Sequence, residues 1–185
     1  MKTTKKITVS ALMIALATVL MWVSKLIPAP WMQGGSVTLA SMVPVITVGI
    51  LLGTKWGLFA SVAYALLQMM FGFYPPPTQT FFNFALVVLL DYIFAFGVLG
   101  LSGLFYKMLG KKYFAIPISA FIVTLLRYIC HIFSGILIWG VYAGEGQSVL
   151  IYSLLYNGSY MIPEIIISTV VTALLFRTRI LKNNL

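Results

Sequence analysis

Polar and ionisable side chains inside long apolar runs are the residues of this sequence that could do chemistry. Residues 113–139 carry the largest group, in which Arg127, His131, Gly135 and Trp139 recur every four residues. On a helix this spacing forms one slowly drifting stripe. The stripe offers a cation, an imidazole, a gap that a flat group can approach, and an indole face. Because charged groups are costly in apolar surroundings, the stripe favours a binding site over simple packing.

Two further apolar runs contribute carboxylates and hydrogen-bonding side chains. Asp91, followed by Tyr92, lies within residues 81–106. Its carboxylate can pair with Arg127, or it can accept hydrogen bonds from the amino group of a ligand. The second run holds Tyr152, Tyr156, Asn157, Tyr160 and Glu164. Glu164 is as consistent with a buried structural carboxylate as with a functional one.

Together these side chains predict a pocket in the outer half of a helix bundle. It would be walled by Trp and Tyr rings and would contain one or two carboxylates, an imidazole and an amide. Aromatic faces attract cations, with roughly 2 kcal/mol or more available in a desolvated site, and a few polar groups fix the orientation of a ligand. The pocket therefore suits a small cationic aromatic ligand.

The sequence carries no catalytic or metal-binding motif. It has no His-Glu-x-x-His for zinc and no phosphate loop ending in Gly-Lys-Ser/Thr. His131 and Ser134 are three residues apart, but no Gly-x-Ser elbow accompanies them, which disfavours a serine hydrolase. One His and one Cys argue against a transition-metal site. We therefore expect a protein that is not an enzyme and that needs no metal or cofactor.

The composition places these residues in a membrane. Of 185 residues, 61% are hydrophobic and 8% are charged, and the mean hydropathy is +1.04. A soluble domain is roughly 25% charged, and one of this length could not bury so much apolar side chain. The net charge of +9 does not indicate nucleic-acid binding, because the basic residues form short clusters between apolar runs. The chain is therefore expected to be an all-α integral membrane protein.

Apolar runs and their flanking charges predict the topology. A spanning helix needs about 20 apolar residues, and consecutive prolines at residues 75–77 mark a firm break. The predicted helices cover residues 7–27, 39–52, 56–73, 81–106, 113–139 and 149–176, in one membrane domain spanning residues 1–185. Ten of the twelve Lys and Arg residues fall on one side of this bundle. Positive loops face the cytoplasm, so we expect a six-transmembrane-helix bundle of the cell membrane with both termini cytoplasmic.

Several motifs of the sequence are similar to those of a known family of membrane proteins. The chain resembles the thiamine-specific substrate-binding subunit (S component) of energy-coupling factor (ECF) vitamin transporters. The resemblance covers essentially the whole length and is carried by the loop with Trp31 and Gly34-Gly35-Ser36-Val37-Thr38-Leu39, by Leu90-Asp91-Tyr92, by His131-x-x-x-Gly135-x-x-x-Trp139, and by Tyr152 with Asn157.

The resemblance implies roles in binding thiamine. Asp91 would bind the aminopyrimidine ring with Tyr92 beside it, although some family members have Glu at this position. His131 and Trp139 would hold the ligand, with Trp139 stacked on the thiazolium. The substrate-binding residues expected on this basis are Trp31, Asp91, Tyr92, His131, Gly135, Trp139, Tyr152 and Asn157.

The same resemblance implies which residues bind the other end of thiamine and which proteins act as transport partners. Tyr152 and Asn157 would bind the hydroxyethyl end, and the loop around Trp31 would close over the pocket. Ala11 and Ala15 form a small-x-x-x-small pair, which alone favours internal helix packing. In the family such a pair docks on the membrane coupling (T) component, which works with two cytoplasmic ATPases. The subunit would capture thiamine outside and release it inside.

Two alternatives stay open at this level. The first is an S component for another vitamin or for a thiamine precursor. An anionic vitamin would prefer more basic residues than Arg127, which favours thiamine. The second is a stand-alone transporter, which would usually show internal repeats or matching broken helices, and the sequence has neither.

Overall fold

The computed structural model describes residues 1–26 and 35–178, and every regular element within these residues is helical. This confirms the all-α fold class. The elements are α1 (Thr3–Ser24), α2 (Met42–Leu52), α3 (Thr54–Gly72), α4 (Phe81–Val87), η1 (Val88–Phe94), α5 (Ala95–Gly97), η2 (Val98–Leu101), α6 (Ser102–Met108), α7 (Ala115–Leu137), η3 (Trp139–Tyr142) and α8 (Val149–Leu175). Elements α4 to α6 follow one another as a helix of 28 residues, Phe81–Met108.

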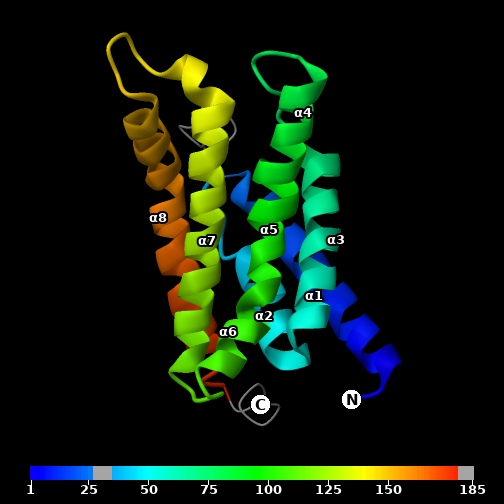
Figure 1. Ribbon diagram of the computed structural model, residues 1–185. Coiled ribbons are helices and arrows are strands. Elements are labelled where there is room, and N and C mark those ends of the chain that lie inside the picture. The colour runs from blue at the N-terminus through cyan, green and yellow to red at the C-terminus, as the bar shows by residue number, and fades with distance from the viewer. Residues whose placement is uncertain (27–34, 179–185) are drawn as a thin grey trace.

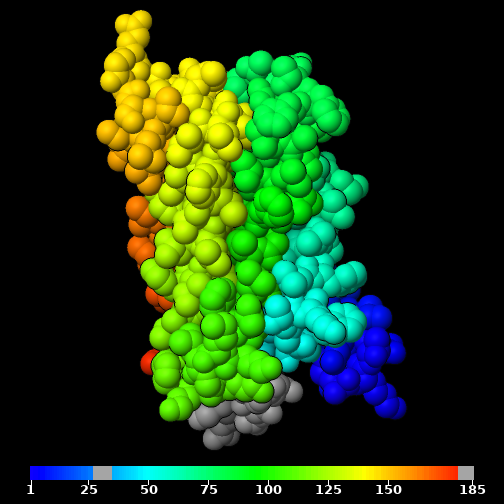
Figure 2. Space-filling model, in the orientation of Figure 1, coloured from blue at the N-terminus to red at the C-terminus, as the bar shows by residue number. Residues whose placement is uncertain are grey.

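The helices run side by side along one axis (Figure 1). α7 packs against α8 on one side and against η1, η2 and α6 on the other, and α3 packs against η2. Figure 2 shows α7 and the Phe81–Met108 helix in contact along most of their length. The start of α1, the α2–α3 turn, the α6–α7 turn and the end of α8 lie at one end of the bundle (Figure 1). Most of the basic residues therefore gather at that end.

The surface of the bundle is apolar. Large side chains such as Leu12, Phe59 and Phe133 are 64%, 62% and 55% exposed. In water such a surface would be a large hydrophobic patch, whereas in a bilayer it faces lipid. Within the described residues, four helical stretches are long and apolar enough to cross a membrane, namely α1, Phe81–Met108, α7 and α8, and α2 is a shorter apolar helix.

Close contact between glycines holds α3 against η2. A Cβ atom on Gly100 would lie 2.5 Å from the carbonyl carbon of Gly57 and 2.5 Å from the amide nitrogen of Leu58. Only residues without a side chain permit this approach, as in other small-residue contacts between membrane helices. Gly53 joins α2 to α3 with φ of 89°, a conformation that glycine adopts without strain.

The first predicted helix is shifted in the structure. It was expected over residues 7–27, but α1 begins at Thr3 and ends at Ser24. Lys5 and Lys6 are included because long lysine side chains near a helix end can extend to the aqueous side. Residues 25 and 26, predicted as helix, form a turn beyond the end of α1, and residue 27 lies outside the described residues.

The helix predicted over residues 113–139 also ends early. α7 stops at Leu137, because Ile138 has φ of −121° and leaves the helical region, and Trp139 begins the separate 3₁₀ turn η3. The stripe is therefore not one continuous helix. Arg127, His131 and Gly135 share α7, whereas Trp139 is carried by a turn that can orient its ring independently.

Candidate functional site

A cavity of about 530 Å³ lies within the bundle, between α1, α3, η1, α7 and α8. It is lined by every predicted substrate-binding residue that the structure describes: Asp91, Tyr92, His131, Gly135, Trp139, Tyr152 and Asn157. Trp31 is the eighth such residue, and it lies outside the described residues. The structure thus brings together residues from four helical elements, namely η1, α7, η3 and α8.

Asp91 is the centre of a hydrogen-bond cluster. Its Oδ1 atom lies 3.0 Å from Nδ1 of His131. Its Oδ2 atom accepts hydrogen bonds from the Ser134 hydroxyl at 2.6 Å and from Nε1 of Trp139 at 3.1 Å. Asp91 sits in η1, a π-helical turn, and such turns occur frequently at functional sites. The turn thus presents a carboxylate to α7 and η3 together.

This cluster orients the imidazole of His131. In the neutral ring, a proton on Nδ1 can be donated to Asp91, which leaves Nε2 as an acceptor. Nε2 is buried and has no hydrogen-bond partner among the described residues. The imidazole therefore presents an unused acceptor to the cavity.

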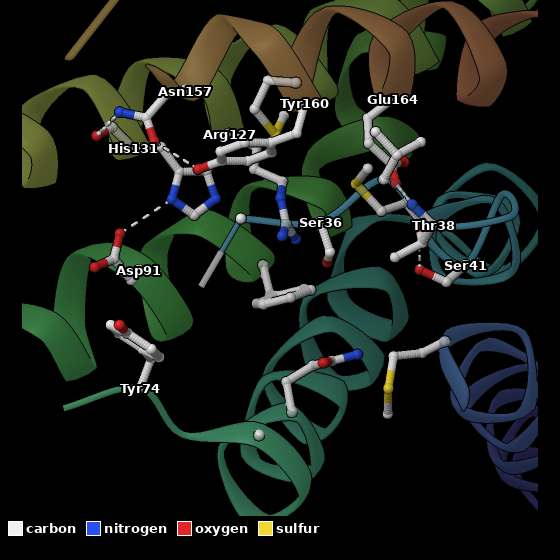
Figure 3. Close-up of a pocket in the computed structure, with 18 of the residues that line it drawn as sticks. Ser36, Thr38, Ser41, Tyr74, Asp91, Arg127, His131, Asn157, Tyr160 and Glu164 are labelled. Atoms are coloured by element: carbon white, nitrogen blue, oxygen red, sulfur yellow. Dashed lines mark hydrogen bonds and ion pairs between the residues drawn. The ribbon is translucent and has the colours of Figure 1, made fainter. Parts of the chain in front are cut away.

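Arg127 does not pair with Asp91, contrary to one of the two roles considered for that carboxylate. Among the described residues, the ion pair of Asp91 is with His131. The guanidinium of Arg127 instead lies over the ring of Phe96, 3.7 Å from its centroid. Its Nε and Nη1 atoms are buried without a partner in the described part of the chain. Figure 3 shows Arg127 between the Asp91 end and the Glu164 end of the cavity.

Asn157 organises the contact between α8 and α7. Its Nδ2 donates to the backbone oxygens of His131 and Ser153 at 3.1 Å and 2.9 Å, and its Oδ1 accepts from the Tyr160 hydroxyl at 2.5 Å. A Cβ atom on Gly135 would lie 2.9 Å from Nδ2 of Asn157. Gly135 therefore lets α8 approach α7 closely, besides lining the cavity.

Aromatic rings cover one end of the cavity. The ring of Trp139 lies 5.5 Å from that of Tyr74 and 6.3 Å from that of Tyr142. Tyr152 stacks on Tyr156 at 5.7 Å, and its hydroxyl has no hydrogen-bond partner among the described residues. These rings provide the aromatic wall that the sequence predicted.

Tyr92 has a structural contact that the sequence did not indicate. Its hydroxyl donates to the backbone oxygen of Gly72 at 3.1 Å and accepts from the amide of Tyr74 at 2.9 Å. It thereby fixes the end of α3, where Tyr74 enters the cavity lining. Tyr92 thus holds another aromatic residue in place.

Several lining residues were not indicated by the sequence: Gln68, Tyr74 and Phe96. The non-helical stretch Gly35–Leu39 also lines the cavity, and it belongs to the loop that was expected to close over the pocket. Gln68 had a detectable signal, because an amide within an apolar helix is itself unusual. Phe96 had no such signal, because nothing in the sequence distinguishes it from the other aromatic residues in the apolar runs.

Among the described residues, the Ser134 hydroxyl is engaged by Asp91 and Trp139 and not by His131. The Ser134 hydroxyl donates to Asp91 and also accepts from Nε1 of Trp139 at 3.0 Å. Within the described residues, no group of three or more His, Cys, Asp or Glu side chains could hold a metal ion. The cavity contains a hydrogen-bonded carboxylate, aromatic faces, and donors and acceptors that have no hydrogen-bond partner among the described residues. These are groups suited to binding a ligand.

Comparisons with known proteins agree with a binding site in a membrane bundle. The family model described as thiamine transporter protein matches residues 7–183. The thiamine transporter ThiT of Bacillus subtilis is 37% identical over 163 residues, which cover 82% of this chain and 81% of the relative. ThiT of Lacticaseibacillus paracasei is 30% identical over 96 residues, covering 47% and 48% of the two chains.

A solved structure supports the fold. ThiT from Listeria monocytogenes superposes with a TM-score of 0.73 at 23% identity, covering 95% of this chain and 96% of the other. With its several apolar helices, the chain is a multi-pass protein of the cell membrane, and the family that it matches is one of transporters and not of enzymes. The match over residues 7–183 together with the Bacillus relative establishes that the chain belongs to the thiamine transporter protein family.

Proposed function

We propose that this protein is the high-affinity thiamine-binding subunit of an ECF-type importer. It captures thiamine outside the cell and delivers it through a membrane coupling component and two ATPase subunits. The observation that carries the proposal is the Asp91–His131–Trp139 cluster, which lines a cavity of about 530 Å³ in a chain of this family.

The chemistry of thiamine matches the groups around the cavity. The vitamin joins an aminopyrimidine ring to a cationic thiazolium ring that bears a hydroxyethyl group. The carboxylate of Asp91 binds the aminopyrimidine ring, and its negative charge also complements the cation. Nε2 of His131, which has no hydrogen-bond partner among the described residues, can accept a hydrogen bond from the amino group. The indole of Trp139 supplies the face on which the thiazolium stacks.

The remaining contacts bind the other end of the ligand. The Tyr152 hydroxyl, which has no hydrogen-bond partner among the described residues, and the Asn157 side chain bind the hydroxyethyl group, and Trp31 closes the site. Arg127 offers Nε and Nη1 as donors to an acceptor on the ligand. These roles make the site specific for shape and hydrogen bonding as well as for charge.

The membrane arrangement of the proposal uses all the helical segments. α1, α2, α3, the Phe81–Met108 helix, α7 and α8 cross the membrane as one domain, with both termini in the cytoplasm. The gathering of basic residues where α1 begins and α8 ends supports this orientation. Ala11 and Ala15 are exposed on α1, which leaves them free to dock on the coupling component.

A ligand panel tests the proposed function. The protein is purified in detergent, and thiamine, riboflavin and biotin are titrated separately by isothermal calorimetry. We expect saturable binding of thiamine at one site and no heat from the other two. Binding of riboflavin or biotin without binding of thiamine would favour an S component for another vitamin.

A further inference from the structure

One wall of the cavity is built from non-helical backbone. The residues Gly35, Ser36, Val37, Thr38 and Leu39 all line the cavity, and none belongs to a helix. A helix in the lining can move only if its backbone hydrogen bonds or its packing are disturbed. The Gly35–Leu39 wall can move once its side-chain contacts with the bundle open.

Two hydrogen bonds tie this wall to the helices behind it. The amide of Thr38 donates to Oε1 of Glu164 on α8, a contact visible in Figure 3. The amide of Leu39 donates to the hydroxyl of Ser24 on α1 at 2.7 Å. The hydroxyl of Thr38 lies 2.7 Å from that of Ser41, which stabilises the turn leading into α2. Glu164 thus provides the tether with a carboxylate acceptor.

The burial of the Glu164 carboxylate carries a free-energy cost. Glu164 is 1% exposed, and its Oε2 atom has no hydrogen-bond partner among the described residues. No ion pair joins it to Arg127 in the described part of the chain. Attraction by the Arg127 guanidinium offsets part of the cost of burying this carboxylate, and the bond to Thr38 gives the carboxylate a structural role.

We infer that Glu164 is a positioning residue that holds the Gly35–Leu39 wall against the cavity and thereby sets how slowly thiamine dissociates. The inference rests on the proposed function and assigns Glu164 no contact with the ligand. Hydrogen bonds to a charged acceptor are stronger than neutral ones. When this bond opens, the wall is held by the weaker Ser24 tether, and the ligand can leave.

Two substitutions separate this role from a purely electrostatic one. Glu164→Gln retains an oxygen that accepts from Thr38, whereas Glu164→Met has a similar size and no such acceptor. Dissociation of thiamine from the purified protein is followed by stopped-flow tryptophan fluorescence after mixing with a competing ligand. We expect Glu164→Met to dissociate roughly ten- to a hundredfold faster, with little change in association rate, and Glu164→Gln to stay within a few-fold of wild type.

A matched control and the opposite results complete the test. Ser168→Ala alters a buried α8 residue one turn beyond Glu164 that does not line the cavity, and thiamine should dissociate from this variant as from wild type. Equal acceleration in the Gln and Met variants would overturn the inference, because the acceptor oxygen that Gln retains for the Thr38 amide would then make no difference to dissociation. Wild-type rates in Glu164→Met would overturn it as well. A wild-type protein that does not bind thiamine would instead contradict the proposed function.

Discussion

At the scale of single residues, the carboxylate of Asp91 gathers three donors from α7 and η3. His131, Ser134 and Trp139 all point a hydrogen-bonding atom at it. Its side chain keeps 16% exposure toward the cavity, so it is both the organiser of the site and a counter-charge for a cation. Removing its charge should therefore disturb affinity more than removing the Ser134 hydroxyl alone.

Replacing Asp91 with Asn tests this organising role. The amide can accept only through one oxygen, and its nitrogen would face donors, so several bonds are lost along with the negative charge. We expect the dissociation constant for thiamine to rise about a hundredfold, equivalent to about 3 kcal/mol, as measured by calorimetry. Ser134→Ala removes one donor and should cost about 1 kcal/mol. Comparable losses in both variants would contradict a central role for the carboxylate.

At the scale of elements, the contact between α3 and η2 depends on two facing glycines. Gly100→Ala places a methyl group against the backbone of residues 57 and 58, and overpacking of this kind typically costs about 1–3 kcal/mol. We expect a lower midpoint of thermal unfolding in detergent.

A neighbouring glycine provides the control for that substitution. A Cβ atom on Gly97 would meet no atom within 4 Å, so Gly97→Ala should leave the midpoint unchanged or raise it slightly. If Gly97→Ala and Gly100→Ala lowered the midpoint equally, the close contact with Gly57 would not be what stabilises this pair of elements.

The elements also show how far the sequence predicts the site. Asp91, His131 and Asn157 could be found because each is polar within an apolar run, where a polar group needs a reason. Periodicity wrongly placed Trp139 on the same helix as His131. The spacing of residues cannot reveal that the backbone at Ile138 leaves the helical conformation. The bond from Thr38 to Glu164 joins residues 126 positions apart. Only tertiary packing brings such a pair together, so Glu164 stayed undecided at the level of sequence.

At the scale of the whole molecule, capture and transport should be separable. Ala11 and Ala15 are exposed on α1 and are absent from the cavity lining. Ala11→Trp should therefore leave thiamine affinity unchanged while blocking close helix approach by a coupling component. We expect energy-dependent thiamine uptake in cells that contain the coupling and ATPase subunits to fall by at least roughly tenfold.

Leu16→Trp is the matched control for the docking surface. Leu16 is 48% exposed on α1 and points about 140° away from Ala11 around the helix axis. Uptake should persist in this variant. Loss of uptake in both variants, or in neither, would argue against docking through the Ala11–Ala15 face.

The most direct measurement of the central claim is a thiamine titration followed by tryptophan fluorescence, comparing wild type with Trp139→Ala. Trp139 lines the cavity and donates to Asp91, so a bound cationic ring should quench it. We predict saturable quenching in wild type and binding weakened by roughly a hundredfold in the variant, since truncating a buried aromatic contact costs about 3 kcal/mol. Absence of saturable binding in wild type, or unchanged affinity in Trp139→Ala, would contradict thiamine capture at this site.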